Sequence, residues 1–197
     1  GSTYSWNGPA GFTSTSQNPT IVNMGTPEAG TYSVTSSTAG CTSPAGIISV
    51  TVNPSPLAPT ASNSGPVCSG QDLSLNATST GASYSWSGPN SFTSTDQDPV
   101  ITGATTAASG TYSVTAFSGG CSSPVSTTSV SVFPNPVSSI SGSTTICNGN
   151  GATLTNNVTG GTSPYTYAWS ESSITSAIFV SPTTTTTYSV LTTDTKG

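Results

Sequence analysis

The sequence predicts an all-β protein built from tandem antiparallel β-sandwiches. Large apolar residues alternate with small polar ones in short strings such as "TYSVTAF" from Thr111, and this period of two is typical of half-buried strands. The chain holds 39 Ser, 38 Thr, 21 Gly and 15 Pro, a composition that suits exposed strand faces and tight turns. A repeat of 80 residues further indicates that several similar domains follow one another.

The same composition is also found in disordered, mucin-like stalks, which have too few large apolar groups to offset the entropy of the chain. The aromatic residues favour the folded alternative, because they recur at strand spacing. We expect six of them to lie in the domain cores: Trp6, Trp86, Trp169, Tyr32, Tyr112 and Tyr188.

The repeat is found by shifting the chain by 80 positions, which aligns Gly1–Leu57 with Gly81–Val137 without a gap. A third, less regular copy contains Cys147, Trp169 and a last "TYSV". We therefore expect a partial domain at 1–53, a complete domain at 54–133 and a partial domain at 134–197. The first copy is expected to lack strands before its Trp and the third its final strand, as in a window on a longer array.

Turn residues divide the middle copy into seven short strand candidates. In chain order they are Thr60–Ser62, Asp72–Ala77, Ser83–Ser87, Ser91–Thr95, Pro99–Thr102, Gly110–Phe117 and Val125–Phe133. Seven short strands in a domain of this size indicate an antiparallel sandwich.

The middle copy also resembles an immunoglobulin-type domain. "GQDLSLNA" from Gly70 has the alternation of strand B, Trp86 lies where strand C carries its buried Trp, and "SGTYSV" from Ser109 resembles the tyrosine corner of strand F. The usual positions of the core disulfide hold Ala77 and Val114. That disulfide is therefore not expected.

The four cysteines lie elsewhere. Cys68 and Cys121 are the two thiols of the middle copy, so we expect a disulfide between them that restrains the unfolded chain by about 4 kcal/mol. Cys41 and Cys147 are expected to pair with residues outside the given sequence. Metal binding is the alternative for four cysteines, but the chain has no His and no CxxC spacing.

One phrase occurs twice, as "YSWNGPAGFTSTSQNP" at Tyr4–Pro19 and as "YSWSGPNSFTSTDQDP" at Tyr84–Pro99. We interpret it as strand C, its turn and the next strand, with a buried Trp before a Gly-Pro turn. Phe12 and Phe92 are expected to close over the edge of the core. In the alternative interpretation, outward-facing Trp and Tyr side chains form a platform for sugar stacking.

The charge content excludes several function classes. Lys196 is the one basic side chain, and only six acidic residues accompany it. General acid–base catalysis and anion binding lack their usual groups, and a nucleic-acid partner lacks a basic surface. No apolar run is long enough to span a membrane. We expect a protein that is not an enzyme, with no catalytic residues and no cofactor.

Asp96 and Asp98 form the one cluster of carboxylates, and oxygen ligands at alternate positions are a weak candidate for Ca²⁺ binding. The first copy has Ser16 and Asn18 at the equivalent positions. A solvated turn is the favoured interpretation.

The third copy supplies a family resemblance. "CNGNGATLTNNVTGGTSPYTYAWSESS" followed by "VSPTTTTTYSVLTTDTKG" is similar to the PKD-like, SprB-type repeats of very large secreted proteins of the Bacteroidota. The first two copies resemble Ig-like repeats of the same proteins. Such proteins are commonly exported by the type IX secretion system and act as adhesins, gliding filaments or spacers. Thr186 departs from the Gly found at Gly30 and Gly110.

Together these features predict a structural segment of an extracellular or cell-surface adhesin, filament or stalk. We expect a disulfide-stapled rod of sandwiches joined by "NPSPLAP" and "FPNPV". Its expected partners are neighbouring repeats, other copies in a fibre and surface polysaccharide, with no nucleic acid and no membrane insertion. The alternative is a glycan- or surface-binding module attached to a secreted protein.

Overall fold

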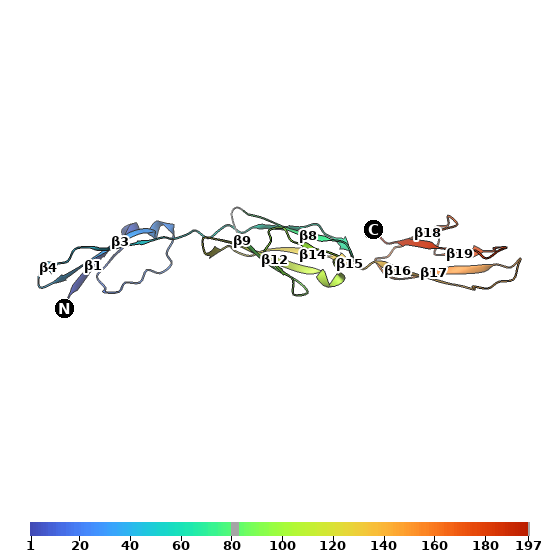
Figure 1. The fold of residues 1–197 in the computed structure, drawn as a ribbon, viewed down its shortest axis with the longest axis horizontal. Coiled ribbons are helices and arrows are strands. Elements are labelled where there is room, and N and C mark those ends of the chain that lie inside the picture. Colours follow the sequence, from blue (N-terminus) through green and yellow to red (C-terminus); the bar gives the residue numbers. More distant parts are fainter. Residues whose placement is uncertain (80–82, 197) are drawn as a thin grey trace. The chain divides into compact units, whose positions relative to one another are not determined.

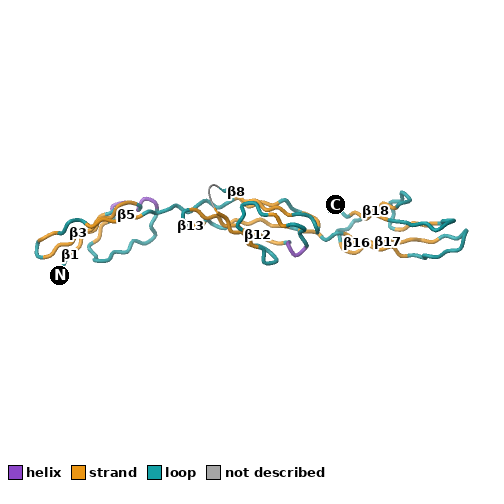
Figure 2. Tube along the Cα trace, viewed as in Figure 1, coloured by secondary structure: helices purple, strands orange, loops and turns teal. Residues whose placement is uncertain are grey.

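The computed structural model describes residues 1–79 and 83–196. β-Strands carry the regular structure, and the described helices are three short 3₁₀ turns at Pro9–Gly11, Thr26–Glu28 and Thr106–Ala108 (Figure 2). Two compact units are formed, one from Gly1–Leu57 with Ala116–Pro124 and the other from Ala58–Thr115 with Val125–Gly197. The chain is thus all-β, as predicted.

The middle copy builds two antiparallel sheets (Figure 1). The first has the order β11-β8-β6 and contains β6 (Thr60–Asn63), β8 (Leu73–Thr78) and β11 (Val100–Ile101). The second has the order β10-β9-β12-β13, with β14 also paired to β12. Its strands are β9 (Ser83–Ser87), β10 (Thr93–Ser94), β12 (Gly110–Ser118), β13 (Cys121–Ser122) and β14 (Ser126–Val130).

A parallel pair completes this domain. In it, β7 (Val67–Cys68) lies beside β15 (Val132–Phe133), with Val132 opposite Val67. The backbone N–H of Val67 donates to the carbonyl of Ser131, 3.2 Å away. This strand order is that of an immunoglobulin-like sandwich, which confirms the predicted fold class.

The core of the middle copy follows from the alternation in its strands. Leu73 and Leu75 on β8 are 0% and 1% exposed, while Ser74 between them faces solvent. From the other sheet, Trp86, Tyr112 and Val114 are equally buried. Each strand has one apolar face, and the two faces meet between the sheets.

The third copy repeats the arrangement with fewer strands. One sheet is β16-β17-β19 and the other is β18-β20. Trp169, Ile178 and Val180 form its core, with Leu154, Tyr167, Tyr188 and Val190 packed against them. The strands are β16 (Pro136–Ser141), β17 (Ala152–Gly160), β18 (Thr166–Trp169), β19 (Ala177–Val180) and β20 (Val190–Thr193).

The first copy has one described sheet, in which β3 pairs with β1, β4 and β5 and β2 pairs with β1. Tyr32 is buried, but Trp6 is only half-buried, unlike its equivalent Trp86. In residues 1–57 the structure describes no second sheet to cover the Trp6 face. The strands are β1 (Thr3–Asn7), β2 (Thr13–Ser14), β3 (Gly30–Thr38), β4 (Cys41–Thr42) and β5 (Gly46–Val50).

Candidate functional site

The repeated phrase holds the sandwich together through the turn after its Trp. The ring of Tyr112 lies against Gly88, so that a Cβ atom added at Gly88 would be 2.3 Å from the ring carbon Cδ1. In the first copy, Gly8 stands in the same relation to Tyr32, at 2.4 Å. Only glycine leaves room for the tyrosine ring here, so this position of the phrase is architectural.

The next residues of the phrase pack on the same tyrosine. Phe92 meets Tyr112 edge to face at a centroid distance of 5.4 Å, a favourable geometry for aromatic pairs. Pro89 rests on Gly110, whose φ of +141° is one that other residues rarely adopt. Phe12 packs on Tyr32 at 5.5 Å in the same way, which agrees with the predicted closure by Phe12 and Phe92.

The tyrosine corner is confirmed in both complete phrases. The hydroxyl of Tyr112 donates to the carbonyl of Ala108 at 2.8 Å, and that of Tyr32 donates to the carbonyl of Glu28 at 2.7 Å. Burial raises the pKa of Tyr112, because the ionised phenolate would be poorly solvated. In the third copy, where Thr186 replaces the glycine, the structure describes no such bond from the half-buried Tyr188.

The three tryptophans share one hydrogen bond. The indole N–H donates to a carbonyl in the following turn: Trp6 to Ser16 at 3.1 Å, Trp86 to Gln97 at 3.3 Å and Trp169 to Thr175 at 2.8 Å. Trp86 and Trp169 are buried. Their ring faces are therefore not available as a sugar-stacking platform.

The carboxylate of Asp98 binds β8. It accepts hydrogen bonds from the Asn76 amide at 2.7 Å and from the Ala77 backbone N–H at 3.2 Å. Asp96 instead faces Ser94, whose hydroxyl lies 3.4 Å from its Oδ2. Ca²⁺ requires six to eight oxygen ligands, and within the described ranges no group of three or more acids, Cys or His residues gathers at one place.

The expected disulfide between Cys68 and Cys121 is not formed, since Cys121 carries a free thiol. Its Sγ donates to the carbonyl of Asn53 at 3.4 Å. Cys41 and Cys147 are exposed, and their pairing with residues outside this sequence stays a prediction.

Strand register gives the physical reason for this correction. Cys121 lies opposite Ser118, the last residue of β12. Cys68 lies opposite Phe133. Phe133 follows Val130 in the chain, and Val130 pairs with Gly110 at the start of β12. Eight residue steps along a strand span roughly 26 Å, whereas a disulfide needs Cα atoms within about 7 Å. The two cysteines therefore lie near opposite ends of β12.

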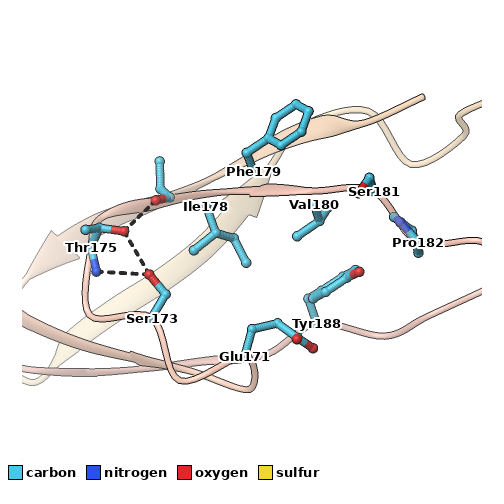
Figure 3. A pocket seen from close by; sticks show the side chains of 10 residues that line it. Glu171, Ser173, Thr175, Ile178, Phe179, Val180, Ser181, Pro182 and Tyr188 are labelled. Atoms are coloured by element: carbon cyan, nitrogen blue, oxygen red, sulfur yellow. Dashed lines mark hydrogen bonds between the residues drawn. The ribbon is translucent and has the colours of Figure 1, made fainter. Parts of the chain in front are cut away.

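A cavity in the third copy is a candidate binding site that sequence reasoning missed. It has a volume of about 540 Å³ and lies beside β19. Figure 3 shows Ile178 and Val180 directed toward Tyr188 and Glu171, whereas Phe179 points the other way. No sequence pattern had distinguished Glu171 from the other acids, because its neighbours are brought to it by folding.

The lining of this cavity combines apolar side chains with hydroxyls. The Thr175 hydroxyl donates to the carbonyl of Ala177 at 2.6 Å and lies 3.0 Å from the Ser173 hydroxyl. Glu171 adds a carboxylate acceptor, and Tyr188 adds a phenol. One carboxylate with several hydroxyls can hydrogen-bond to a neutral, hydroxyl-rich ligand.

Comparison with known proteins leaves the family open. No protein-family model matches the chain, and no curated protein matches its sequence. The described residues contain no helix that is long and apolar enough to cross a membrane.

Solved structures of Ig-domain proteins are similar in fold. The N-terminal eight Ig domains of Down Syndrome Cell Adhesion Molecule share 16% identity at a TM-score of 0.45, covering 85% of this chain and 29% of that chain. Domains 3–5 of Drosophila OTK share 11% identity at 0.43, with 100% and 82% covered. The ectodomain of mouse nectin-like molecule 4 shares 13% at 0.43, with 91% and 79% covered. The chain thus spans less than a third of the first structure.

Proposed function

We propose that this chain is a structural repeat segment of an extracellular or cell-surface protein, which spaces other modules or builds a fibre. The resemblance of its third copy to SprB-type repeats supports an adhesin, gliding filament or stalk of the Bacteroidota, exported by the type IX secretion system. Neighbouring repeats are its first partners, and other copies of the chain are its partners in a fibre. The protein acts without catalysis, cofactor or nucleic acid.

The packing of the repeated phrase around its tyrosine is the observation that carries this proposal. In both copies, its glycine, proline and phenylalanine contact one tyrosine corner at nearly equal distances. A phrase kept for ligand binding would direct side chains outward. Here the side chains hold β1 to β3 and β9 to β12, as a repeated building block requires.

The junction between the middle and third copies supports a stiff spacer. Only Pro134 and Asn135 separate β15 from β16. The Asn135 side chain donates to the carbonyl of Ser69 at 2.9 Å, and the ammonium of Lys196 lies 4.8 Å from the centre of the Phe133 ring. A proline with a fixed φ and two side-chain contacts limit the bending of this short link. Without a disulfide between Cys68 and Cys121, such links are what would stiffen the array.

Small-angle X-ray scattering on the 197-residue chain tests the spacer. A compact protein of this length has a radius of gyration of about 16 Å, and a spacer should exceed that value clearly. A matched variant with Gly in place of Pro134 and Pro136 should give a broader distribution of distances at unchanged β-sheet content. A radius near the compact value for the unmodified chain would contradict the proposal.

A second candidate function is binding of a surface glycan in the cavity beside β19. The carboxylate of Glu171 and the neighbouring hydroxyls favour it. The exposed ring of Phe179, 73% accessible, lies on the opposite face of the same strand (Figure 3). Glycan-array binding that is lost in Glu171→Gln but kept in Asp72→Asn, a change in the middle copy that does not line the cavity, would establish this function. Equal signals from both variants would exclude the cavity.

A further inference from the structure

The sequence contains three Asn-Gly dipeptides, at Asn7–Gly8, Asn148–Gly149 and Asn150–Gly151. In such a dipeptide the backbone nitrogen of the glycine can attack the side-chain amide of the asparagine before it, because glycine has no Cβ to hinder the approach and its backbone reorients easily. The attack requires a glycine that is free to move and an N–H that is not held in a hydrogen bond. The structure gives the three glycines different surroundings.

Gly8 is held on both counts. Its N–H donates to the carbonyl of Phe12 at 3.0 Å. The ring of Tyr32 lies so close that a Cβ atom added at Gly8 would be 2.4 Å from the ring, and this tyrosine is buried. Attack on Asn7 therefore requires that the hydrogen bond break and that the sheet around Tyr32 open.

Gly151 is held by packing. A Cβ atom added there would lie 2.3 Å from Cζ of Phe179, so the ring covers this glycine. The next residue, Ala152, is the first of β17 and pairs with Val180 on β19. The strand pairing and the ring both restrain the backbone that would have to turn toward Asn150.

Gly149 has neither restraint. It lies in an exposed turn, in which the N–H of Asn150 donates to the carbonyl of Cys147 at 3.0 Å, so that Asn148 and Gly149 are the two central residues. A Cβ atom added at Gly149 would meet no atom within 4 Å. Within the described ranges, no hydrogen bond from the Gly149 N–H is found.

We propose that Asn148 is a self-modification site, at which the chain converts its own asparagine into aspartate and isoaspartate. The backbone nitrogen of Gly149 bonds to Cγ of Asn148, and the bond from Cγ to the side-chain nitrogen breaks. That nitrogen leaves as ammonia with the proton of the Gly149 N–H. Water then opens the resulting succinimide ring at one of its two C–N bonds, which leaves a carboxylate. One water is consumed and one ammonia is released, and no oxidant or cofactor takes part.

The modification places a charge where the chain has none. Asn148 lines an open groove of about 780 Å³ in the third copy, together with apolar and hydroxyl side chains such as Leu154 and Tyr188. None of the described residues that line it is charged, and the one basic side chain, Lys196, lies over the ring of Phe133 instead. A carboxylate on this wall opposes burial of the groove against an apolar surface, because the charge would lose its water. This inference goes beyond the spacer function and does not depend on it.

Hydroxylamine tests the proposal, because it cleaves a chain at the succinimide ring. In the folded 197-residue chain, the bond between Asn148 and Gly149 should be cleaved roughly tenfold or more faster than the other two Asn-Gly bonds, since those react only after local opening. In concentrated urea, where the packing is lost, the three bonds should be cleaved at similar rates. Mass spectrometry of the fragments measures all three rates.

Two variants identify the reacting residue. Asn148→Gln should abolish the fast cleavage, because the longer side chain must form a larger ring, whereas Asn150→Gln in the same turn should leave it unchanged. Equal cleavage of the three bonds in the folded chain, or fast cleavage that is lost in Asn150→Gln, would overturn the proposal. Circular dichroism verifies that both variants are folded.

A second measurement needs no reagent. After incubation of the folded chain at neutral pH, peptide mapping should find aspartate and isoaspartate at position 148 while Asn7 and Asn150 stay intact. Complete retention of Asn148, under conditions in which the chain in urea loses it, would also overturn the proposal.

Discussion

Replacement of Gly88 by Ala is the most direct test of the architecture around Tyr112. The new Cβ would lie 2.3 Å and 2.5 Å from ring carbons Cδ1 and Cε1, whereas carbon atoms pack at about 3.5 to 4.0 Å. The ring would have to move by more than about 1 Å. Tyr112 is fully buried, so neighbouring side chains oppose this movement.

The cost has two parts. Overpacking of a core costs about 1 to 3 kcal/mol. Displacement of the ring also stretches the 2.8 Å bond from its hydroxyl to Ala108, and a buried polar group left without a partner costs about 1 to 3 kcal/mol. Gly88→Ala should therefore lower the free energy of unfolding of the middle copy by about 2 kcal/mol or more.

Hydrogen-exchange mass spectrometry on peptides from β12 measures this change in the middle copy alone. Gly46→Ala is the matched control, because its new Cβ would meet Val34 at an ordinary 3.6 Å and should change stability by less than about 0.5 kcal/mol. In a Tyr112→Leu background, Gly88→Ala should cost less, since the ring is gone. A loss below about 1 kcal/mol with the tyrosine present would refute the reasoning.

Three further predictions concern the burial of the tryptophans, the titration of Tyr112 and the thiol of Cys121. Trp86→Ala should cost about 3 to 5 kcal/mol in urea unfolding, and Trp6→Ala clearly less, since Trp6 is half-buried; equal losses would contradict this. Because burial raises the pKa of Tyr112, the unfolded chain ionises first, and stability should fall as pH rises above about 10. Tyr112→Phe should flatten that fall, and an unchanged slope would argue against it. Iodoacetamide should label Cys121 without reductant. A Cys121 that is labelled only after reduction would support the disulfide instead.

The predictable parts of the fold were those set by local alternation. Ser83–Ser87 is a strand with the predicted bounds, and Leu73–Thr78 differs by one residue at each end from the segment predicted from Asp72. The predicted strand Val125–Phe133 instead divides at Ser131, where the chain leaves β12 and pairs with β7. A change of partner depends on residues far away in sequence, so periodicity does not indicate it.

The sites were less predictable for a related reason. The cysteines were paired from their number within one copy, but bonding depends on which end of β12 each one reaches. The two acids near Gln97 looked alike in sequence. Folding gives Asp98 two donors from β8, while Asp96 receives none from that strand. Glu171 lines a cavity only because folding places the residues of β19 beside it.

The closeness in sequence of the groups around Tyr112 has a genetic consequence. Gly88, Pro89 and Phe92 all lie within 25 positions of the tyrosine that they contact. Unequal crossing-over between gene segments that encode neighbouring copies would exchange complete sets of these partners. The number of copies can then grow or shrink from one generation to the next without separating the glycine from its ring.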